Sequence, residues 1–267
     1  MITKFNDYLV KCNLAKSTIA AYVSTVDFYI HNYPDVSKSN LLAYKGYLLE
    51  HFKPQTVNLR VQAMNKYLEF LEQEDLKMKF VKVQQKNFLE NVISDADYRF
   101  LKAKLRENEM MDWYFVVWFL AATGARVSEL LQIKAEHVAA GHIDIYSKGG
   151  KVRRLYIPCK LRDEALRWLR CKEMYSGYIF LNRYGKRITP RGVGSQLKHF
   201  AELYGLNRDV MYPHSFRHRF AKNFLEKFND LSLLADLMGH ESLETTRIYL
   251  RRTASEQRRI VDSVVDW

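Results

Sequence analysis

Apolar residues recur at helical spacing along most of this chain, and one stretch departs from that pattern. Residues 142–146 and 152–157 alternate between apolar and polar side chains on either side of Gly149-Gly150, which is typical of a β-hairpin. The remaining apolar residues fit helices. The spacing therefore predicts a mainly α chain with a small β-sheet.

A polar run at residues 72–91 divides the helical pattern into two parts. We predict a module of four helices within residues 1–80, a linker over 81–92, and a mixed α/β domain over 93–267 that contains the hairpin. Ser17 is the expected N-cap of the second helix, and Ser37 or Ser39 that of the third.

The chain is strongly basic, with 42 Lys and Arg residues against 30 Asp and Glu residues and a formal net charge of +12. Short basic clusters on folded segments suit a surface that follows nucleic-acid phosphates, although a generically basic protein would show the same total. The candidate phosphate contacts in these clusters are Lys151, Arg153, Arg154 and Arg247.

Membrane and secretory patterns are not recognisable. The most apolar stretch, residues 113–122, has about half of the roughly 20 residues that a membrane helix needs. The three cysteines (Cys12, Cys159 and Cys171) form no C-x-x-C pair, which argues against a disulfide framework and a zinc site. We expect a cytoplasmic protein that contacts no membrane and binds no metal.

Four polar motifs stand out in the second domain: Thr123–Leu130 (TGARVSEL), Pro213–Phe220 (PHSFRHRF), the pair Gly239-His240 and, nine residues after that histidine, Tyr249. Each has an ordinary explanation when it is taken singly. Arg126 can pair with Glu129, and a histidine after a helix-ending glycine is commonly a cap. Most of the 17 tyrosines must belong to the core.

In combination and in this order, the motifs resemble the tyrosine site-specific recombinases, also called the phage integrase family, over essentially the whole chain. The two-domain, Xer-like members are the most similar. The resemblance implies a helical, SAM-like core-binding domain at 1–80 and a catalytic domain at 93–267. It also implies cleavage and rejoining of DNA through a 3′-phosphotyrosine and a four-way junction, without any cofactor.

The resemblance implies specific roles for the matching residues. Tyr249 matches the nucleophile, and Arg126 and Arg217 match the two arginines that hold the scissile phosphate. This choice is chemically reasonable, because planar guanidinium groups stabilise the charge that develops on non-bridging phosphate oxygens.

Proton transfer is expected to involve two further groups. His214 matches the residue that accepts or relays the proton of the tyrosine, and His240 matches a hydrogen-bond donor to the phosphate. The leaving 5′-oxygen needs a general acid, which the family takes from a lysine of the hairpin. Lys148 matches best, and Lys151, across the glycine pair, is the alternative.

Three more residues are expected to support this set. Glu129 matches a carboxylate that orients the active-site cations, and His218 is expected to pack beside them. Arg219 stands where the family commonly has a small hydroxyl residue, so it is a candidate for either local packing or an added phosphate contact.

The expected partner is double-stranded DNA at specific inverted-repeat sites, on which four copies of the chain assemble. Residues 254–267 are predicted to form a helix with an apolar stripe. That stripe would pack either on its own domain or on a neighbouring protomer. Accessory proteins are compatible with this scheme, and integration, excision, inversion and dimer resolution are all open outcomes.

Two other interpretations remain at this stage. A topoisomerase of the related tyrosine class would use similar residues, although the small size of the chain and its helical first module argue against it. A DNA-binding protein with a decayed recombinase fold is the second alternative, and the complete set of motif residues argues against that one.

Overall fold

The structure is a computed structural model that describes residues 1–83, 91–146, 152–240, 242–250 and 254–265, without the side chains of residues 254–257 and 260. The chain divides into two units, Met1–Gln85 and Lys86–Trp267, and each has its own hydrophobic core. The two units are described separately below.

Four helices build the first unit: α1 (Ile2–Lys11), α2 (Lys16–Asn32), α3 (Lys38–His51) and α4 (Pro54–Phe70), followed by the 3-10 turn η1 (Glu74–Leu76). The Ser37 hydroxyl accepts a hydrogen bond from the Asn40 N–H and caps α3. Helix α2 begins one residue before Ser17, with Ala15 in the capping position, so the prediction of a Ser17 cap was wrong.

Two asparagines of α4 hold the segment that follows η1. The Asn65 side chain donates to the Met78 carbonyl at 2.9 Å and accepts from the Met78 N–H at 2.8 Å. Asn58 binds the backbone of Val81 in the same way, at 2.9 and 2.8 Å. Because these paired contacts replace a strand partner for the backbone, the chain is fastened to the first unit as far as Val81.

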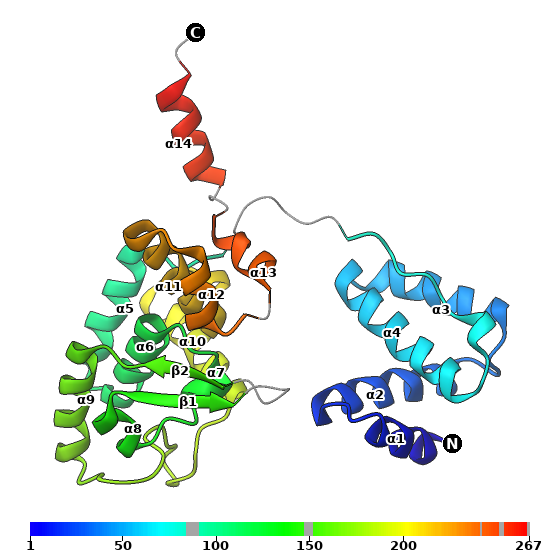
Figure 1. Ribbon diagram of the computed structural model, residues 1–267, viewed down its shortest axis with the longest axis horizontal. Helices are drawn as coiled ribbons and strands as arrows, with labels where there is room; N and C mark the ends of the chain where they lie inside the picture. Colours follow the sequence, from blue (N-terminus) through cyan, green and yellow to red (C-terminus); the bar gives the residue numbers. More distant parts are fainter. Residues whose placement is uncertain (84–90, 147–151, 241, 251–253, 266–267) are drawn as a thin grey trace. The chain divides into compact units, whose positions relative to one another are not determined.

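The second unit contains the remaining elements: α5 (Asp95–Glu107), α6 (Met111–Thr123), α7 (Val127–Leu130), α8 (Ala135–Ala140), β1 (His142–Tyr146), β2 (Val152–Tyr156), α9 (Cys159–Cys171), α10 (Pro190–Tyr204), η3 (Arg208–Val210), α11 (Pro213–Phe228), α12 (Leu231–Met238), α13 (Leu243–Arg247), η4 (Ile248–Leu250) and α14 (Ala254–Val264). Helix α6 lies in the interior, where α5, α9 and α11 pack against it (Figure 1). All its residues from Tyr114 to Ala121 are buried, as expected for a helix that is apolar on every side.

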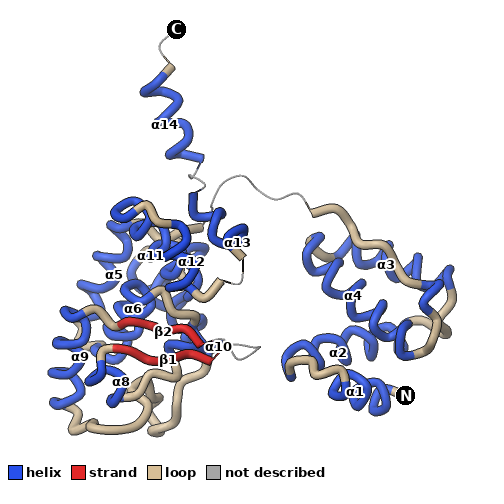
Figure 2. Tube along the Cα trace, viewed as in Figure 1, coloured by secondary structure: helices blue, strands red, loops and turns tan. Residues whose placement is uncertain are grey.

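Strands β1 and β2 form a two-stranded antiparallel sheet (Figure 2). Ile143 lies opposite Leu155 and Ile145 lies opposite Arg153, and all four of these residues are buried. The prediction of a mainly α chain with a small sheet is confirmed. Among the described residues, no helix combines the length and the apolar character that crossing a bilayer requires.

Candidate active site

The first motif lies in the turn between α6 and α7. Gly124 ends α6 with a φ of +63°, and a Cβ added to it would collide with the Phe220 ring of α11. Only glycine satisfies both conditions without strain. The turn places Arg126 directly before α7, beside the two helices that carry the other motifs.

Arg126 is held by the carboxylate three residues along. Its Nη1 donates to Glu129 Oε1 at 2.9 Å, and its backbone N–H donates to Glu129 Oε2 at 2.7 Å. Its Nη2 donates to the carbonyl of Gly239 at 3.1 Å. The Arg126 side chain is 36% exposed and that of Glu129 only 7%, so the carboxylate anchors the guanidinium from inside.

Arg217 lies at the buried centre of the site, on α11. Its Nη1 donates to the Gly124 carbonyl at 2.6 Å, and its Nη2 donates to the Met238 carbonyl at 2.7 Å. The same Nη2 lies 3.0 Å from His240 Nε2. Burial, with the charge of Arg126, lowers the pKa of Arg217 to about 10, which leaves it charged at neutral pH.

The histidine of the third motif follows the end of α12. Gly239 ends that helix in the left-handed conformation, with a φ of +61°. His240 Nδ1 lies 2.7 Å from the hydroxyl of Thr246, a fully buried residue of α13. This contact fixes the ring, and leaves Nε2 toward Arg217.

Tyr249 lies between two of the histidines. Its side chain is buried, and its ring stacks against that of His240, with centroids 6.1 Å apart. Its hydroxyl lies 3.2 Å from His218 Nδ1. His214, one turn earlier on α11, has its ring centroid 6.2 Å from that of His218. The structure thus brings His218, rather than His214, to the tyrosine hydroxyl.

Burial sets the protonation of the site. It lowers the pKa of both His218 and His240 to about 4, and neighbouring positive charges add to the effect. Both rings are therefore neutral near pH 7, and burial also lowers the pKa of His214. Burial raises the pKa of Tyr249, while Arg217 and Arg126 act in the opposite direction. The phenol is thus protonated, and its hydroxyl lies beside the neutral imidazole of His218.

One candidate phosphate contact is not at the surface. Arg153 is 9% exposed, because strand alternation points it inward with Leu155. Its Nη2 forms an ion pair with Glu129 Oε2, and its Nη1 donates to the Leu237 carbonyl. The expectation that Arg153 contacts DNA is therefore corrected to a structural role inside the domain.

The other candidate phosphate contacts differ in their surroundings. Arg219 is also turned inward: its side chain is 14% exposed, pairs with Asp95 at 2.8 Å and lies over the Tyr98 ring. That position corresponds to the packing alternative. Arg154 and Arg247 are exposed, and each pairs at the surface with a carboxylate: Arg154 with Asp144 of the neighbouring strand β1, and Arg247 with Glu244 of its own helix α13. Lys148 and Lys151 lie outside the described residues.

Sequence reasoning missed Thr246 and the backbone carbonyls around the two glycines. Thr246 orients His240, but a threonine six residues after a histidine carries no distinguishing signal. The carbonyls have no sequence signal at all. The two glycines that end α6 and α12 were the available clue, because a left-handed cap redirects the last carbonyls of a helix.

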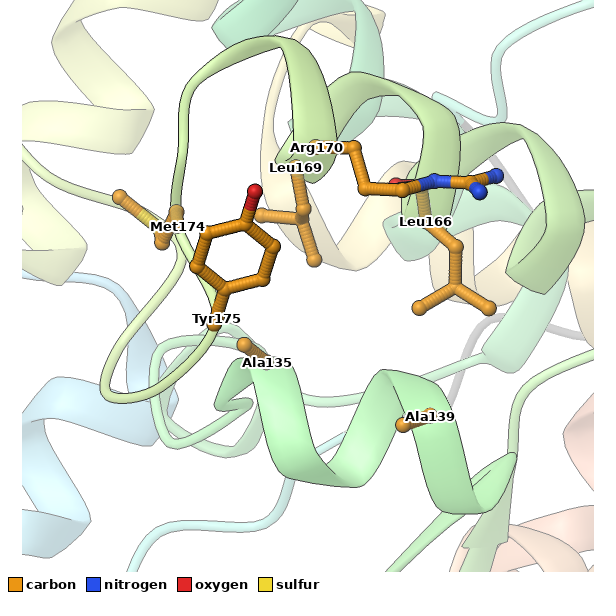
Figure 3. A pocket seen from close by; sticks show the side chains of 7 residues that line it. All are labelled: Ala135, Ala139, Leu166, Leu169, Arg170, Met174 and Tyr175. Carbon is orange, nitrogen blue, oxygen red and sulfur yellow. The ribbon is translucent and has the colours of Figure 1, made fainter.

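The described residues hold no group of three or more His, Cys, Asp or Glu side chains suited to a metal ion. A pocket of about 360 Å³ lies elsewhere, where Leu166 and Leu169 of α9 face Ala135 and Ala139 of α8 (Figure 3). Its lining is largely apolar, with Arg170 and Tyr175 beside the aliphatic residues, and it contains none of the residues of the four motifs. The arginine and histidine cluster around Tyr249 is therefore the candidate active site.

Comparison with known proteins identifies the family of the chain. Residues 90–256 match the family model described as "Phage integrase family". The chain is 29% identical over 279 residues to tyrosine recombinase XerA of Pyrococcus furiosus, covering 98% of this chain and 93% of the relative. It is 28% identical over 282 residues to tyrosine recombinase XerD of Listeria monocytogenes, covering 92% and 91%.

Solved structures share the fold. A crystal structure of XerA recombinase matches with a TM-score of 0.56 at 20% identity, covering 98% of this chain and 96% of that one. The XerH site-specific recombinase bound to its difH substrate matches with a TM-score of 0.68 at 21% identity, covering 91% and 79%. With the family model spanning more than half of its length, the chain belongs to the phage integrase family of tyrosine recombinases, the enzymes that cleave and rejoin DNA.

Proposed function

We propose that Tyr249 is the nucleophile of this recombinase and that Arg126 and Arg217 hold the scissile phosphate. In this scheme the Tyr249 oxygen bonds to phosphorus and the bond from phosphorus to the 5′-oxygen breaks. The resulting 3′-phosphotyrosine retains the phosphodiester energy, so that a 5′-hydroxyl of a second DNA strand can reverse the step. The observation that carries the proposal is the buried Tyr249 hydroxyl among Arg217, His218 and His240.

The geometry favours His218 as the immediate acceptor of the phenol proton. Its Nδ1 lies 3.2 Å from the Tyr249 hydroxyl, and the ring is neutral, so Nδ1 can accept when Nε2 carries the ring proton; the lowered pKa of His218 makes it a weak base, and the proton must therefore pass on. The sequence assigned this step to His214, which remains the candidate for relaying the proton or binding the phosphate. His240 is oriented by Thr246, and its Nε2 accepts from Arg217 in this structure, so donation from Nε2 to a non-bridging oxygen would require the Arg217 contact to break and Nε2 to carry the proton.

Lys148 is the proposed general acid for the 5′-oxygen, and Lys151 is the alternative. We expect Lys148→Ala to slow cleavage on the order of 10²–10⁴-fold, and we expect replacement of the scissile 5′-oxygen by sulfur to restore the rate, because a thiolate leaves without a proton. Lys151→Ala serves as the matched control. If sulfur rescues Lys151→Ala and not Lys148→Ala, the assignment of the two lysines is reversed.

The proposed substrate is double-stranded DNA carrying inverted-repeat sites, bound by the basic surface of both units. Arg154 and Arg247 remain candidate phosphate contacts, because both are exposed and a phosphate can replace their single surface partners. Two cleavage and exchange rounds through a four-way junction would require four protomers on two sites. The cytoplasm is the expected place of action, because the proposed substrate is intracellular DNA.

Helix α14 is the proposed link between protomers. Val261, Val264 and Val265 of its apolar stripe are 55%, 61% and 43% exposed, so they are not covered by their own domain. A head-to-tail arrangement of such contacts closes into a ring of four. Docking of this stripe on a neighbour would connect the active sites, since α14 follows soon after Tyr249.

Deleting residues 256–267 should leave binding to a single site nearly intact and abolish cooperative assembly on two sites. The double variant Val261→Asp/Val264→Asp should have the same effect, while Asp262→Ala on the same helix should not. Mobility-shift titrations on one-site and two-site DNA measure both quantities. A truncated protein that assembles as well as the full chain, or that unfolds, would contradict the docking proposal.

The function is tested by incubating the protein with fragmented genomic DNA and trapping protein-linked ends under denaturing conditions. We expect covalent adducts at a small number of sequences with inverted symmetry, in the presence or absence of a metal chelator. Sequencing the attached ends identifies the site. Binding to DNA without any covalent adduct would instead favour a protein that has kept the fold and lost catalysis.

A further inference from the structure

We propose that Arg153 is a positioning residue that aligns Arg126 and the end of α12 for catalysis. Its side chain is 8% exposed and pairs with the buried carboxylate of Glu129, so its charge is already matched inside the domain. Its two guanidinium partners, Glu129 and the Leu237 carbonyl, both belong to the frame of the active site. The proposal rests on the function proposed above, and it adds a residue to that machinery.

The last carbonyls of α12 lie beyond the regular hydrogen bonds of the helix and need other partners. Two of them accept hydrogen bonds from the residues that end the helix. The His240 N–H donates to the Ala235 carbonyl and the Gly239 N–H donates to the Asp236 carbonyl, both at 3.0 Å. The next three carbonyls in the chain each accept from a different arginine. The pairs are Arg153 with Leu237, Arg217 with Met238 and Arg126 with Gly239.

This row explains how three guanidinium groups can lie together. The last carbonyls of a helix carry the negative end of its dipole, so cations are stabilised there. Each carbonyl holds one guanidinium group in place. The negative charge of Glu129 offsets part of the repulsion between the three arginines. Three arginines and one carboxylate leave a net charge of +2, and the single negative charge of a phosphodiester offsets half of it.

Arg153 and Arg126 share a second partner, the carboxylate of Glu129. Arg153 binds Glu129 Oε2, while Glu129 Oε1 binds the guanidinium of Arg126. Arg153 and Glu129 are both almost completely buried, whereas Arg126 is 36% exposed and faces outward. Arg153 therefore joins β2, α7 and α12 into one frame, and Arg126 is the group that this frame presents to a substrate.

Gly239 supplies an independent observation in support. A Cβ added at this position would overlap the Arg153 side chain, which passes directly over the glycine backbone. The close approach of Arg153 thus requires glycine at the turn that leads to His240, in addition to the left-handed φ. Because Arg153 packs tightly against the backbone of Gly239, it also fixes the position of the next residue, His240.

Removing Arg153 should weaken catalysis and leave DNA binding unchanged. We expect Arg153→Gln to slow adduct formation about 10–100-fold, as is typical when a residue that orients a catalytic group is lost. Arg153→Lys keeps the charge but can satisfy only one of the two partners, so its defect should be intermediate. Lys102→Gln is the matched control, because it removes a half-buried cation that lies over the rings of Trp118 and Tyr114.

The deciding measurement compares two scissile groups in a nicked duplex that carries the sequence recovered from genomic DNA. One is an ordinary phosphate, and the other is a methylphosphonate, in which a non-bridging oxygen is replaced and the charge is lost. The wild type should prefer the phosphate, because its cations are aligned on that charge. Arg126→Ala should lose the preference, and Arg153→Gln should lose it in part.

A purely structural defect would slow both substrates by the same factor and would overturn the proposal. Arg153→Gln cleaving the phosphate at the wild-type rate would overturn it as well. If Arg153→Gln fails to fold in thermal unfolding, the same comparison is made with Arg153→Lys. Failure of the proposed function is distinguishable from all of these outcomes, since it would appear as a wild-type protein that forms no adduct through Tyr249.

Discussion

Replacing Tyr249 by phenylalanine should abolish covalent protein–DNA adducts while DNA binding persists. The change removes only a hydroxyl, and the ring can keep its stacking contact with His240. Without the phenolic oxygen there is no atom to bond to phosphorus. We expect a loss on the order of 10⁶-fold, the scale for removing the nucleophile of a covalent catalyst. Denaturing gels of a nicked duplex measure the adduct, and mobility shifts measure binding.

Tyr212→Phe is the matched control for this experiment. Tyr212 lies just before α11, and its hydroxyl donates to the Asn91 carbonyl at 3.1 Å. Its loss removes one hydrogen bond of a neighbouring tyrosine, which typically costs about 1 kcal/mol of folding stability and no chemistry. Adducts that survive in Tyr249→Phe would show that another residue attacks the phosphate, and the proposed mechanism would then be wrong.

Much of the fold could be predicted because it depends on apolar spacing, which is a property of the sequence alone. The four helices of the first unit and the hairpin were predicted in this way. The start of α2 was not, because a helix can begin at Lys16 on the strength of its buried face, even when Ala15 offers no side-chain cap. Periodicity thus identifies which face is buried better than it identifies the first residue.

The active site was predictable in its members and less so in its contacts. The motifs bring Arg126, Arg217, His240 and Tyr249 together. Which histidine meets the tyrosine could not be predicted, because His214 and His218 are one turn apart on α11 and only the packing of η4 selects between them.

At Arg153, the charge pattern and the strand alternation of the sequence point to opposite locations. Its place in a basic cluster with Lys151 and Arg154 predicts a surface cation. Strand alternation contained the correct information, since Arg153 shares the inner face of the hairpin with Leu155. Burying an arginine has a large desolvation penalty unless carboxylates and carbonyls bind its guanidinium group. For Arg153 those partners, Glu129 and the Leu237 carbonyl, come from segments far away in the sequence.

Arg217 combines charge with fixed geometry, so its substitution should have a large effect on catalysis. Its guanidinium binds the Gly124 and Met238 carbonyls and also meets His240. A lysine ammonium carries the same charge, but it is a point donor without the planar fork that reaches all three positions. The site therefore depends on the shape of this group as well as on its charge.

We expect Arg217→Ala to slow adduct formation on the order of 10²–10³-fold, as for the loss of one preorganised donor to a developing oxyanion. Arg217→Lys should recover only a small part of that loss, because the lysine cannot hold both carbonyls and the phosphate together. Lys227→Gln, at an exposed position of the same helix, is the control. Since Arg217→Ala leaves two buried carbonyls unpaired, the thermal unfolding of each variant is measured first, and cleavage is compared well below the lowest unfolding temperature. Cleavage by Arg217→Lys within about threefold of the wild type would mean that charge alone is sufficient, and that the carbonyls at the ends of α6 and α12 do not align this arginine for catalysis.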